Sequence, residues 1–225
     1  MMPENTFTER LLTLAGQAGV SLSPDQARMC YTHLRLMLEW NRKLNLTRIT
    51  DPEEIITKHF LDSMIPARRL PQSGLALDVG TGPGFPGVPL KVLLPDLHMV
   101  LLEGLRKKVS FLRVLLSHLP CGNLWALQGK WEEFRRIDHP LAARRYSLIT
   151  MRAVRLEPEH LSVLAANILD PGGVFAWWTG PGVRMEAEEL DRFAAGTGLR
   201  FEADYSYSLP PDALPRRLLT WRKVT

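Results

Sequence analysis

The sequence predicts an α/β fold with a mainly parallel, seven-stranded sheet, a C-terminal antiparallel hairpin and a preceding N-terminal helical region. From Leu75 onward, short apolar runs alternate with segments of helical periodicity, which is the pattern of βαβ units. The last two apolar runs are joined by little more than residues 209–213, too few for a helical crossover, so these strands should pair antiparallel. Before Leu75 the chain carries only helix signals.

The N-terminal helices begin at capping signals. Ser23 is the predicted N-cap of a helix over about 24–44, because Pro24 suits the first helical position and Gln26 stands three residues after the cap. Another helix is predicted to start within residues 50–54, where acidic side chains suit the positive end of the helix dipole.

The remaining elements follow a break at residues 70–74 that is rich in Pro, Ser and Gly. Strands are predicted at 75–79, 99–103, 123–127, 146–150, 173–178, 200–207 and 217–224. Helices are predicted at about 86–94, 105–119, 130–136, 158–168 and 184–196. We therefore divide the chain into a helical region, 1–72, packed on a sheet-bearing domain, 73–225.

Composition narrows the class of protein. The 225 residues are 45% hydrophobic and 23% charged, which suits a compact fold with a real core. Cys30 and Cys121 form neither a disulfide framework nor a zinc-ligand spacing, so a reducing compartment is expected and no metal is. We see no signal-peptide pattern and no apolar run long enough for a membrane. The net charge of +4 is compatible with a nucleic-acid partner.

A glycine-rich turn at residues 78–87 follows the first predicted strand. In an open α/β sheet, ligands bind at the carboxyl ends of the strands, where such a first turn lies. Its glycines let the backbone approach a ligand closely. The next strand ends in Glu103, and an acid there reaches ribose hydroxyls in nucleoside and dinucleotide sites alike.

The composition of the turn separates the candidate ligands. Residues 82–87 fit the dinucleotide pattern G-x-G-x-x-G, but in the register that starts at Gly80 the third glycine is replaced by Phe85. The two prolines of the turn also lack N–H donors that a pyrophosphate needs. Asp78 would repel a phosphate, whereas it suits the cationic amino-acid end of S-adenosylmethionine. We favour adenosylmethionine, with a dinucleotide or a ligand-free turn as alternatives.

Four stretches together resemble one family of enzymes. Residues 40–47 match its W-N-x-K-x-N-L-T, residues 59–63 its H-x-x-D-S, residues 78–87 its glycine turn, and residues 101–112 its second-strand end and basic helix. The chain thus resembles the bacterial 16S rRNA guanine-N7 methyltransferases of the RsmG family, also called glucose-inhibited division protein B. The resemblance spans about residues 30–180.

The resemblance implies a Rossmann-like class I methyltransferase fold and a cytoplasmic enzyme. Its reaction would be the S-adenosylmethionine-dependent methylation of N7 of a loop guanine in 16S rRNA or the small ribosomal subunit. The family's methyl-donor contacts fall on Gly80, Phe85, the pair Trp131–Glu132 and Arg152. With the residues of the turn and the second strand, the predicted cofactor set is Asp78, Gly80, Gly82, Phe85, Glu103, Trp131, Glu132 and Arg152.

Two departures from the family pattern lie in this set. The family commonly has G-R-A-E where this chain has residues 129–132, and often Asp-Ser where it has Glu103 and Gly104. A backbone contact to adenine survives the first change. The second keeps the carboxylate and lengthens its reach.

The implied chemistry requires no proton transfer before attack. Guanine N7 carries a free lone pair and no proton, so the enzyme has mainly to align nitrogen, methyl carbon and sulfur. We therefore predict no catalytic acid or base. A base inside an A-form helix hides N7 in a deep, narrow groove, which favours an unpaired guanine as the target.

Basic clusters provide candidate contacts to RNA phosphates. The predicted RNA-binding residues are Arg106, Lys107, Lys108, Arg216 and Arg217. Each cluster alone is more typical of a solvated face, whereas the clusters together, on a sheet enzyme with a nucleoside-type turn, favour a polyanion. A monomer is the expected state.

Several side chains have two interpretations. Arg152 either contacts the ligand or pairs with an acid of the turn, and we favour the ligand. His59 and Asp62 either tether the helical region or approach the substrate, and we favour the tether. The polar residues Asn41, Lys43 and Asn45 either satisfy helix ends or contact RNA. Residues 177–178, both tryptophans, more simply end a buried strand than stack on bases.

Three rival functions remain at this point. The first is a methyltransferase of the same fold with another RNA or small-molecule substrate. The second is a non-catalytic RNA- or ribosome-binding protein, and the third is a nicotinamide-dependent oxidoreductase.

Overall fold

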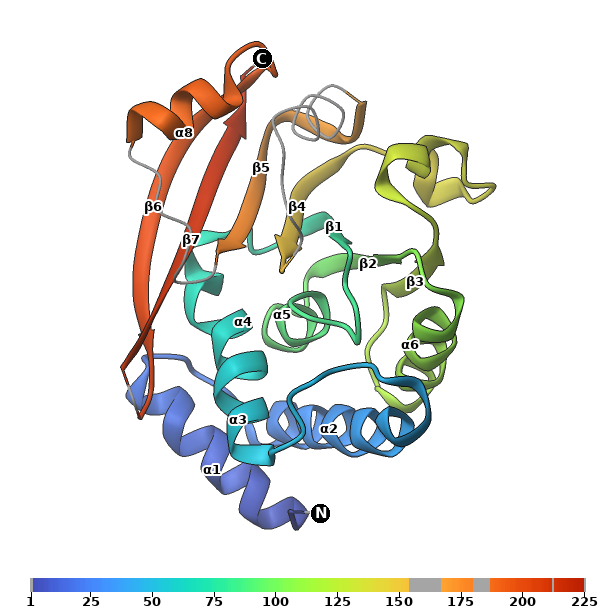
Figure 1. Cartoon of the computed structure of the whole chain (residues 1–225), viewed down its shortest axis with the longest axis vertical. Coiled ribbons are helices and arrows are strands. Elements are labelled where there is room, and N and C mark those ends of the chain that lie inside the picture. Colours follow the sequence, from blue (N-terminus) through green and yellow to red (C-terminus); the bar gives the residue numbers. More distant parts are fainter. Residues whose placement is uncertain (1, 154–166, 180–186, 212, 225) are drawn as a thin grey trace.

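A seven-stranded sheet forms the centre of the molecule in the computed structural model, which describes residues 2–153, 167–179, 187–211 and 213–224 (Figure 1). The strand order is β3-β2-β1-β4-β5-β7-β6. The strands are β1 (Gly74–Val79), β2 (Leu97–Glu103), β3 (Leu124–Gln128), β4 (Tyr146–Arg152), β5 (Leu169–Thr179), β6 (Leu199–Leu209) and β7 (Leu214–Lys223). β7 runs opposite to the other strands and pairs antiparallel with β5 and β6, which confirms the predicted sheet and hairpin.

The largest difference from the predicted strands is the start of β5. It begins at Leu169 rather than residue 173, because Leu169 pairs with Tyr146 before the ladder continues at Val174. The intervening Asp-Pro-Gly-Gly segment breaks the register and forms an irregularity between the two pairs. An apolar-run criterion stops at such residues, so the isolated pair was not predicted.

The N-terminal region is helical, as predicted. It contains α1 (Glu4–Gln17), α2 (Pro24–Leu44), the consecutive segments α3 (Pro52–Ile55), η1 (Ile56–Leu61, a π-helix) and α4 (Asp62–Met64), and the 3₁₀ turn η2 (Ile65–Arg69). Ser23 and Gln26 form the predicted capping box of α2. The Asp51 side chain caps α3 by accepting from the Glu54 N–H.

Helices also connect the strands. These are α5 (Gly87–Leu93), α6 (Arg106–His118), the 3₁₀ segments η3 (Trp131–Arg136) and η4 (Pro140–Ala143), and α8 (Ala187–Ala194). The predicted helix at 130–136 is therefore a 3₁₀ segment, a form that is common in short connectors. The predicted helix at 158–168 lies outside the described residues except for its last two positions. The helix predicted at 184–196 is described from Ala187.

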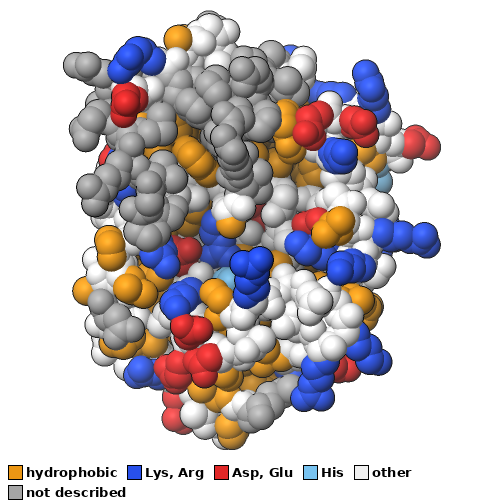
Figure 2. Space-filling view, viewed as in Figure 1, with side chains coloured by type: hydrophobic (Ala, Val, Ile, Leu, Met, Phe, Trp, Pro, Cys, Tyr) orange, Lys and Arg blue, Asp and Glu red, His pale blue; other side chains and the backbone are white. Residues whose placement is uncertain are grey.

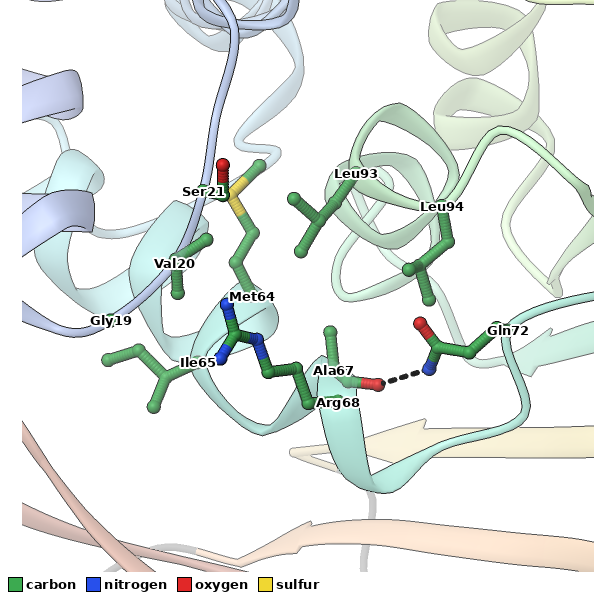
Figure 3. Close-up of a pocket in the computed structure, with 10 residues that line it drawn as sticks. All are labelled: Gly19, Val20, Ser21, Met64, Ile65, Ala67, Arg68, Gln72, Leu93 and Leu94. Carbon is green, nitrogen blue, oxygen red and sulfur yellow. Dashed lines mark hydrogen bonds between the residues drawn. The ribbon is translucent and has the colours of Figure 1, made fainter.

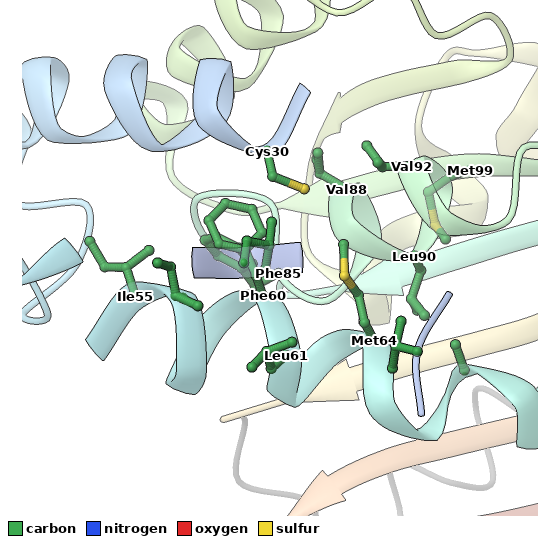
Figure 4. Close-up of a cluster of buried hydrophobic side chains, with 14 of the residues drawn as sticks. Cys30, Ile55, Phe60, Leu61, Met64, Phe85, Val88, Leu90, Val92 and Met99 are labelled. Atoms are coloured by element: carbon green, nitrogen blue, oxygen red, sulfur yellow. The ribbon is translucent and has the colours of Figure 1, made fainter. Parts of the chain in front are cut away.

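Two apolar clusters cover the two faces of the sheet. Alternate residues of β2 divide between them, with Met99 and Leu101 in one cluster and Val100 and Leu102 in the other. The first cluster also contains buried side chains of α1, α2, α3 and η1, so the helical region and the sheet share one core (Figure 4). The tryptophans at 177–178 are buried at the end of β5, as predicted.

Candidate functional site

Asp78 at the end of β1 organises the glycine turn from inside. Its carboxylate accepts hydrogen bonds from Thr81 Oγ1 at 2.6 Å, Thr150 Oγ1 at 2.8 Å and the Gly87 N–H at 2.9 Å. The side chain is fully buried, and burial raises the pKa of Asp78 to about 6 against the opposing effect of these donors. The structure thus places the Asp78 carboxylate inside the protein, where it joins β1, β4 and α5, and its contact with the cofactor stays a prediction.

Gly87 at the start of α5 is a glycine for a steric reason. A Cβ there would lie 2.7 Å from Asp78 Oδ2 and 2.4 Å from Leu101 Cδ2. The close approach of α5 to β1 and β2 is what lets the Gly87 N–H reach the carboxylate.

The turn has used its N–H donors before any ligand arrives. Gly80 and Thr81 both donate to Leu102 O, and Gly84 and Phe85 both donate to Thr81 O. Gly82 donates to Glu103 Oε2 at 3.0 Å, and the two prolines have no N–H. A pyrophosphate needs several such donors, so the geometry disfavours a dinucleotide. The φ angles of Gly80 and Gly82, 68° and 59°, lie in the left-handed region that favours glycine.

Glu103 lies at the end of β2, beside the turn, as predicted. One carboxylate oxygen accepts from Gly82 N–H, and the other accepts from Leu105 N–H at 2.9 Å. Each carboxylate oxygen can accept a second hydrogen bond. Glu103 therefore fixes the turn and still has acceptor capacity for ribose hydroxyls.

An open cleft of about 220 Å³ lies at the carboxyl ends of β1, β2 and β3. Its lining residues are Val79, Gly80, Leu102, Gly104, Gly129, Lys130, Trp131 and Glu132. A glycine follows the end of each strand at Gly80, Gly104 and Gly129, so no Cβ narrows the cleft at these positions. The structure thus brings Gly80, Trp131 and Glu132 together, as the resemblance implied, and the lining fits a nucleoside.

Phe85 faces away from this cleft. Its ring is stacked between the imidazoles of His33 and His59, with ring centroids 4.6 Å apart on each side. The ring is buried, so the side chain of Phe85 is a packing element rather than part of the cleft wall. Any ligand contact of this residue would have to come from its backbone.

Arg152 at the end of β4 also turns toward the helical region. Its guanidinium donates to Lys58 O and to Asp62 Oδ2, each at 3.2 Å, and lies over the ring of Phe85. It therefore pairs with an acid, as the alternative interpretation held, but the acid is Asp62 of the helical region. Arg152, for which a ligand contact was the preferred interpretation, is not among the residues that line the cleft.

His59 and Asp62 tether the helical region to the sheet, as favoured from the sequence. Asp62 accepts from Tyr207 Oη at 2.7 Å, and its carboxylate lies 3.5 Å from Arg216 Nε. His59 Nδ1 accepts from Arg152, which leaves its Nε2–H to donate to Thr47 Oγ1 at 3.2 Å. Burial and then the Arg152 charge lower the pKa of His59 to about 3.

His33 in α2 is a site residue that sequence reasoning missed. Its Nε2–H donates to the carbonyl of Pro83 in the turn at 2.7 Å, and its ring stacks on Phe85. Nδ1 is buried without a hydrogen-bond partner, and burial lowers the pKa of His33 to about 4. The only sequence signal was a histidine on the apolar face of a helix.

The predicted RNA-binding residues fall into two groups. Arg106 and Lys107 at the start of α6 are exposed and Lys108 is half-buried, and none forms an ion pair within the described part of the chain. Arg216 and Arg217 in β7 instead face Asp62 and Asp204. The structure thus distinguishes a cluster without ion pairs among the described residues, at the start of α6, from a cluster that is paired with acids, in β7.

Other hollows lie away from the turn. One of about 190 Å³ lies between the α1–α2 connection, η2 and the end of α5 (Figure 3). It contains Gln72, just before β1, and so opens at the amino end of the sheet. Ligands of such sheets bind at the opposite end.

No helix in the described ranges is long and apolar enough to cross a membrane. No group of three potential metal-ligating side chains occurs among them either.

The fold recurs in solved methyltransferases. One is a putative methyltransferase from Thermoplasma acidophilum (TM-score 0.52, 12% identity, 69% of this chain and 70% of that chain covered). Another is TYW2 of P. horikoshii in complex with MeSAdo (TM-score 0.53, 16% identity, 73% and 62% covered). The likeness shows the fold. The fold is that of the Rossmann-like class, with an open cleft at the carboxyl ends of its strands.

Sequence comparisons give the family. The family model GidB, described as rRNA small subunit methyltransferase G, matches residues 26–201. Ribosomal RNA small subunit methyltransferase G 1 of Syntrophobacter fumaroxidans is 48% identical over 98% of this chain and 99% of its own length. Ribosomal RNA small subunit methyltransferase G of Lachnoclostridium phytofermentans is 34% identical over 100% of this chain and 90% of its own length. The chain belongs to the rRNA small subunit methyltransferase G family.

Proposed function

We propose that this chain transfers the methyl group of S-adenosylmethionine to N7 of a loop guanine in 16S rRNA. The family match over residues 26–201 supports the rRNA substrate. The use of S-adenosylmethionine as methyl donor is supported by the glycine-lined cleft beside Glu103 at the carboxyl end of the sheet. The enzyme works as a monomer in the cytoplasm, on naked rRNA or on the small subunit.

Within this proposal, the cofactor lies along the ends of β1, β2 and β3. Glu103 accepts hydrogen bonds from the ribose hydroxyls, while Trp131 and Glu132 border the adenine. The turn offers acceptors rather than donors, because its N–H groups are already bonded and the Gly80 carbonyl accepts no hydrogen bond within the described residues. That polarity suits a cationic ligand better than an anionic one.

The chain's own contribution to the reaction is positioning. Adenosylmethionine supplies a methyl group on a positively charged sulfur, and guanine N7 attacks it without losing a proton. Holding the reacting atoms in line contributes about 7–11 kcal/mol in favourable cases. Asp78, Glu103 and His33 hold the turn in a fixed shape, so they act on alignment rather than on proton transfer.

The decisive test is methyl incorporation into the target RNA. The purified chain is incubated with labelled adenosylmethionine and either naked 16S rRNA or small subunits that lack the modification, and the product base is mapped. We expect label at one guanine N7 and a rate that is constant with pH around neutrality. Label elsewhere would contradict the site, and RNA binding without label would identify a non-catalytic protein.

A ligand assay separates the oxidoreductase alternative. Adenosylmethionine at 100 times its dissociation constant should stabilise the folded chain by about 2.7 kcal/mol, whereas NAD should leave the melting temperature unchanged. The reverse outcome would contradict the cofactor assignment.

A further inference from the structure

Packing accounts for most of the motif at residues 40–47. The Asn41 side chain holds the backbone of Thr47, donating to its carbonyl at 3.0 Å and accepting from its N–H at 2.9 Å. Asn45 ends α2 in a left-handed conformation with φ of 49°. Leu46 is buried in the shared core. The structure resolves the two interpretations of Asn41 and Asn45 in favour of the helix end.

Trp40 and Lys43 are the two residues of the motif that have no role in these contacts at the helix end. Lys43 is exposed and forms no ion pair within the described residues. Trp40 is only half-buried. Because Trp40 and Lys43 are three residues apart in α2, their side chains lie on the same face of the helix. Together with Glu39 and Leu44 they line a hollow of about 350 Å³ at the end of α2.

The hollow lies beside α6. The ring of Trp40 contacts that of Phe111 in α6, with centroids 5.9 Å apart. Phe111 lies about 7 Å along the helix axis from Arg106, and α6 begins two residues after Gly104 of the cofactor cleft. Figure 2 shows Lys and Arg side chains on the right of the molecule, where Figure 1 has α6 and the end of α2. One helix, α6, thus follows the cleft in the chain, carries the cations in its first turn and packs on Trp40 of the hollow.

We propose that the hollow at the end of α2 is a subsite for an unpaired nucleotide of the rRNA, distinct from the target guanine. The base packs on Trp40, and its phosphates lie on Lys43 and the cations of α6. A half-buried tryptophan beside lysines is the combination that single-stranded nucleic acid binds, since every base has a face to stack and every nucleotide a phosphate. The RNA identity of the ligand rests on the proposed function.

The lining also matches the edge of a base. Glu39 is exposed, and its carboxylate is engaged only by Arg35, 3.7 Å away on the helix surface, among the described residues. It can accept a hydrogen bond from a base amino group. A nucleotide combines a face that stacks on Trp40, amino groups that can donate to Glu39 and a phosphate for Lys43, so it uses the whole lining.

The test compares Trp40→Leu and Lys43→Gln with matched controls. Trp125→Leu changes a half-buried tryptophan of β3, and Arg222→Gln changes a cation that pairs with Glu202. Binding of 16S rRNA is measured by filter retention over a range of salt concentrations. We expect Trp40→Leu to weaken binding about tenfold and Lys43→Gln to lower the salt slope by about 0.7, while both controls bind like wild type.

Further readouts separate the subsite from a structural effect. Trp40→Phe keeps the packing on Phe111 and should recover most of the lost affinity. The KM for rRNA should rise in Trp40→Leu with kcat and adenosylmethionine affinity unchanged. Photo-cross-linking with 4-thiouridine-substituted rRNA should label the peptide that contains Trp40.

Specific outcomes would overturn the proposal. If wild type methylates rRNA while Trp40→Leu and Lys43→Gln bind it normally, the subsite is wrong and the proposed function stands. If wild type binds rRNA without methylating it, the proposed function fails and the binding assays still decide the subsite. If Trp40→Leu does not fold, an unchanged affinity and salt slope in the exposed Lys43→Gln variant refute the subsite.

Discussion

The C-terminal hairpin and the start of α6 carry similar clusters of cations, but only one of them is neutralised. In the hairpin, three arginines each lie within 3.5 Å of an acid: Arg216 with Asp62, Arg217 with Asp204, and Arg222 with Glu202. At the start of α6, residues 106–108 have no such acid in the described structure. The two clusters look alike in the sequence and differ in what surrounds them.

Strand pairing explains the difference. In the β6–β7 ladder the acids of β6 lie close to the arginines of β7, and Asp62 approaches from the helical region. At the first turn of α6, by contrast, Arg106 and Lys107 are exposed, and the nearby acid Glu103 is engaged by the backbone N–H groups of Gly82 and Leu105. We infer that the hairpin cations hold the fold and that the α6 cations are left for a polyanion.

The largest expected effect concerns the buried acid of the hairpin network. Asp62→Ala leaves Arg152 and Arg216 without their counter-charge in a site where all three side chains are less than a fifth exposed. The free energy of unfolding should fall by about 3–5 kcal/mol in urea titrations. Asp204→Asn, at the more exposed pair with Arg217, is the control and should cost less than about 1 kcal/mol. Equal losses in the two variants would contradict a structural role specific to Asp62.

The second prediction concerns the unpaired cluster. Changing Arg106, Lys107 and Lys108 together to Gln removes three phosphate contacts. At 0.1 M salt, affinity for 16S rRNA should fall about 100-fold, and the slope of log affinity against log salt should shrink by about 2. The double variant Arg217→Gln/Arg222→Gln should bind as wild type. A larger loss in the hairpin variant would reverse the comparison.

The third prediction concerns His33, a buried histidine that faces no acidic side chain in the described structure. The folded chain keeps His33 neutral, with a pKa of about 4 against 6.5 ordinarily, so the unfolded chain binds the proton more readily. The resulting stability is present at neutral pH and is lost as the pH falls from about 6.5 toward 4. Between pH 7 and 5 the free energy of unfolding should decline by about 2 kcal/mol more in wild type than in His33→Phe. Parallel pH profiles would show that His33 does not titrate in this way.

The smallest effect is expected at the outer edge of the hairpin. Arg222 and Glu202 are both more than a third exposed, so solvent screens their attraction. Arg222→Gln should change the free energy of unfolding by no more than about 1 kcal/mol and leave rRNA affinity unaltered. A loss comparable with that of Asp62→Ala would mean that the outer pairs are as important as the buried one.

The elements of the fold were predictable where local signals determine them. Apolar runs located the seven strands, and Ser23 with Gln26 located the start of α2, because capping is a contact between residues close in sequence. The start of β5 at Leu169 was missed because a single pair across an irregular ladder leaves no periodic pattern.

Contacts between distant segments limited the prediction of the site. Gly80, Trp131 and Glu132 meet at the cleft because parallel strands end on the same side of a sheet, and Glu103 lies behind them against the turn. The orientation of Arg152 and the ion pairs of β7 depend on which residue of another element lies opposite. Composition and spacing hold no information on that register.

The stack of His33, Phe85 and His59 bears on how the protein can be divided. Its outer rings come from residues before position 72 and its middle ring from the cofactor turn. A fragment that starts at residue 73 would expose the ring of Phe85 and free the Pro83 carbonyl that His33 holds. Anyone who wishes to transplant this cofactor turn into another scaffold must therefore carry α2 and η1 with it. The helical region therefore helps to hold the shape of the cofactor site and is not a detachable module.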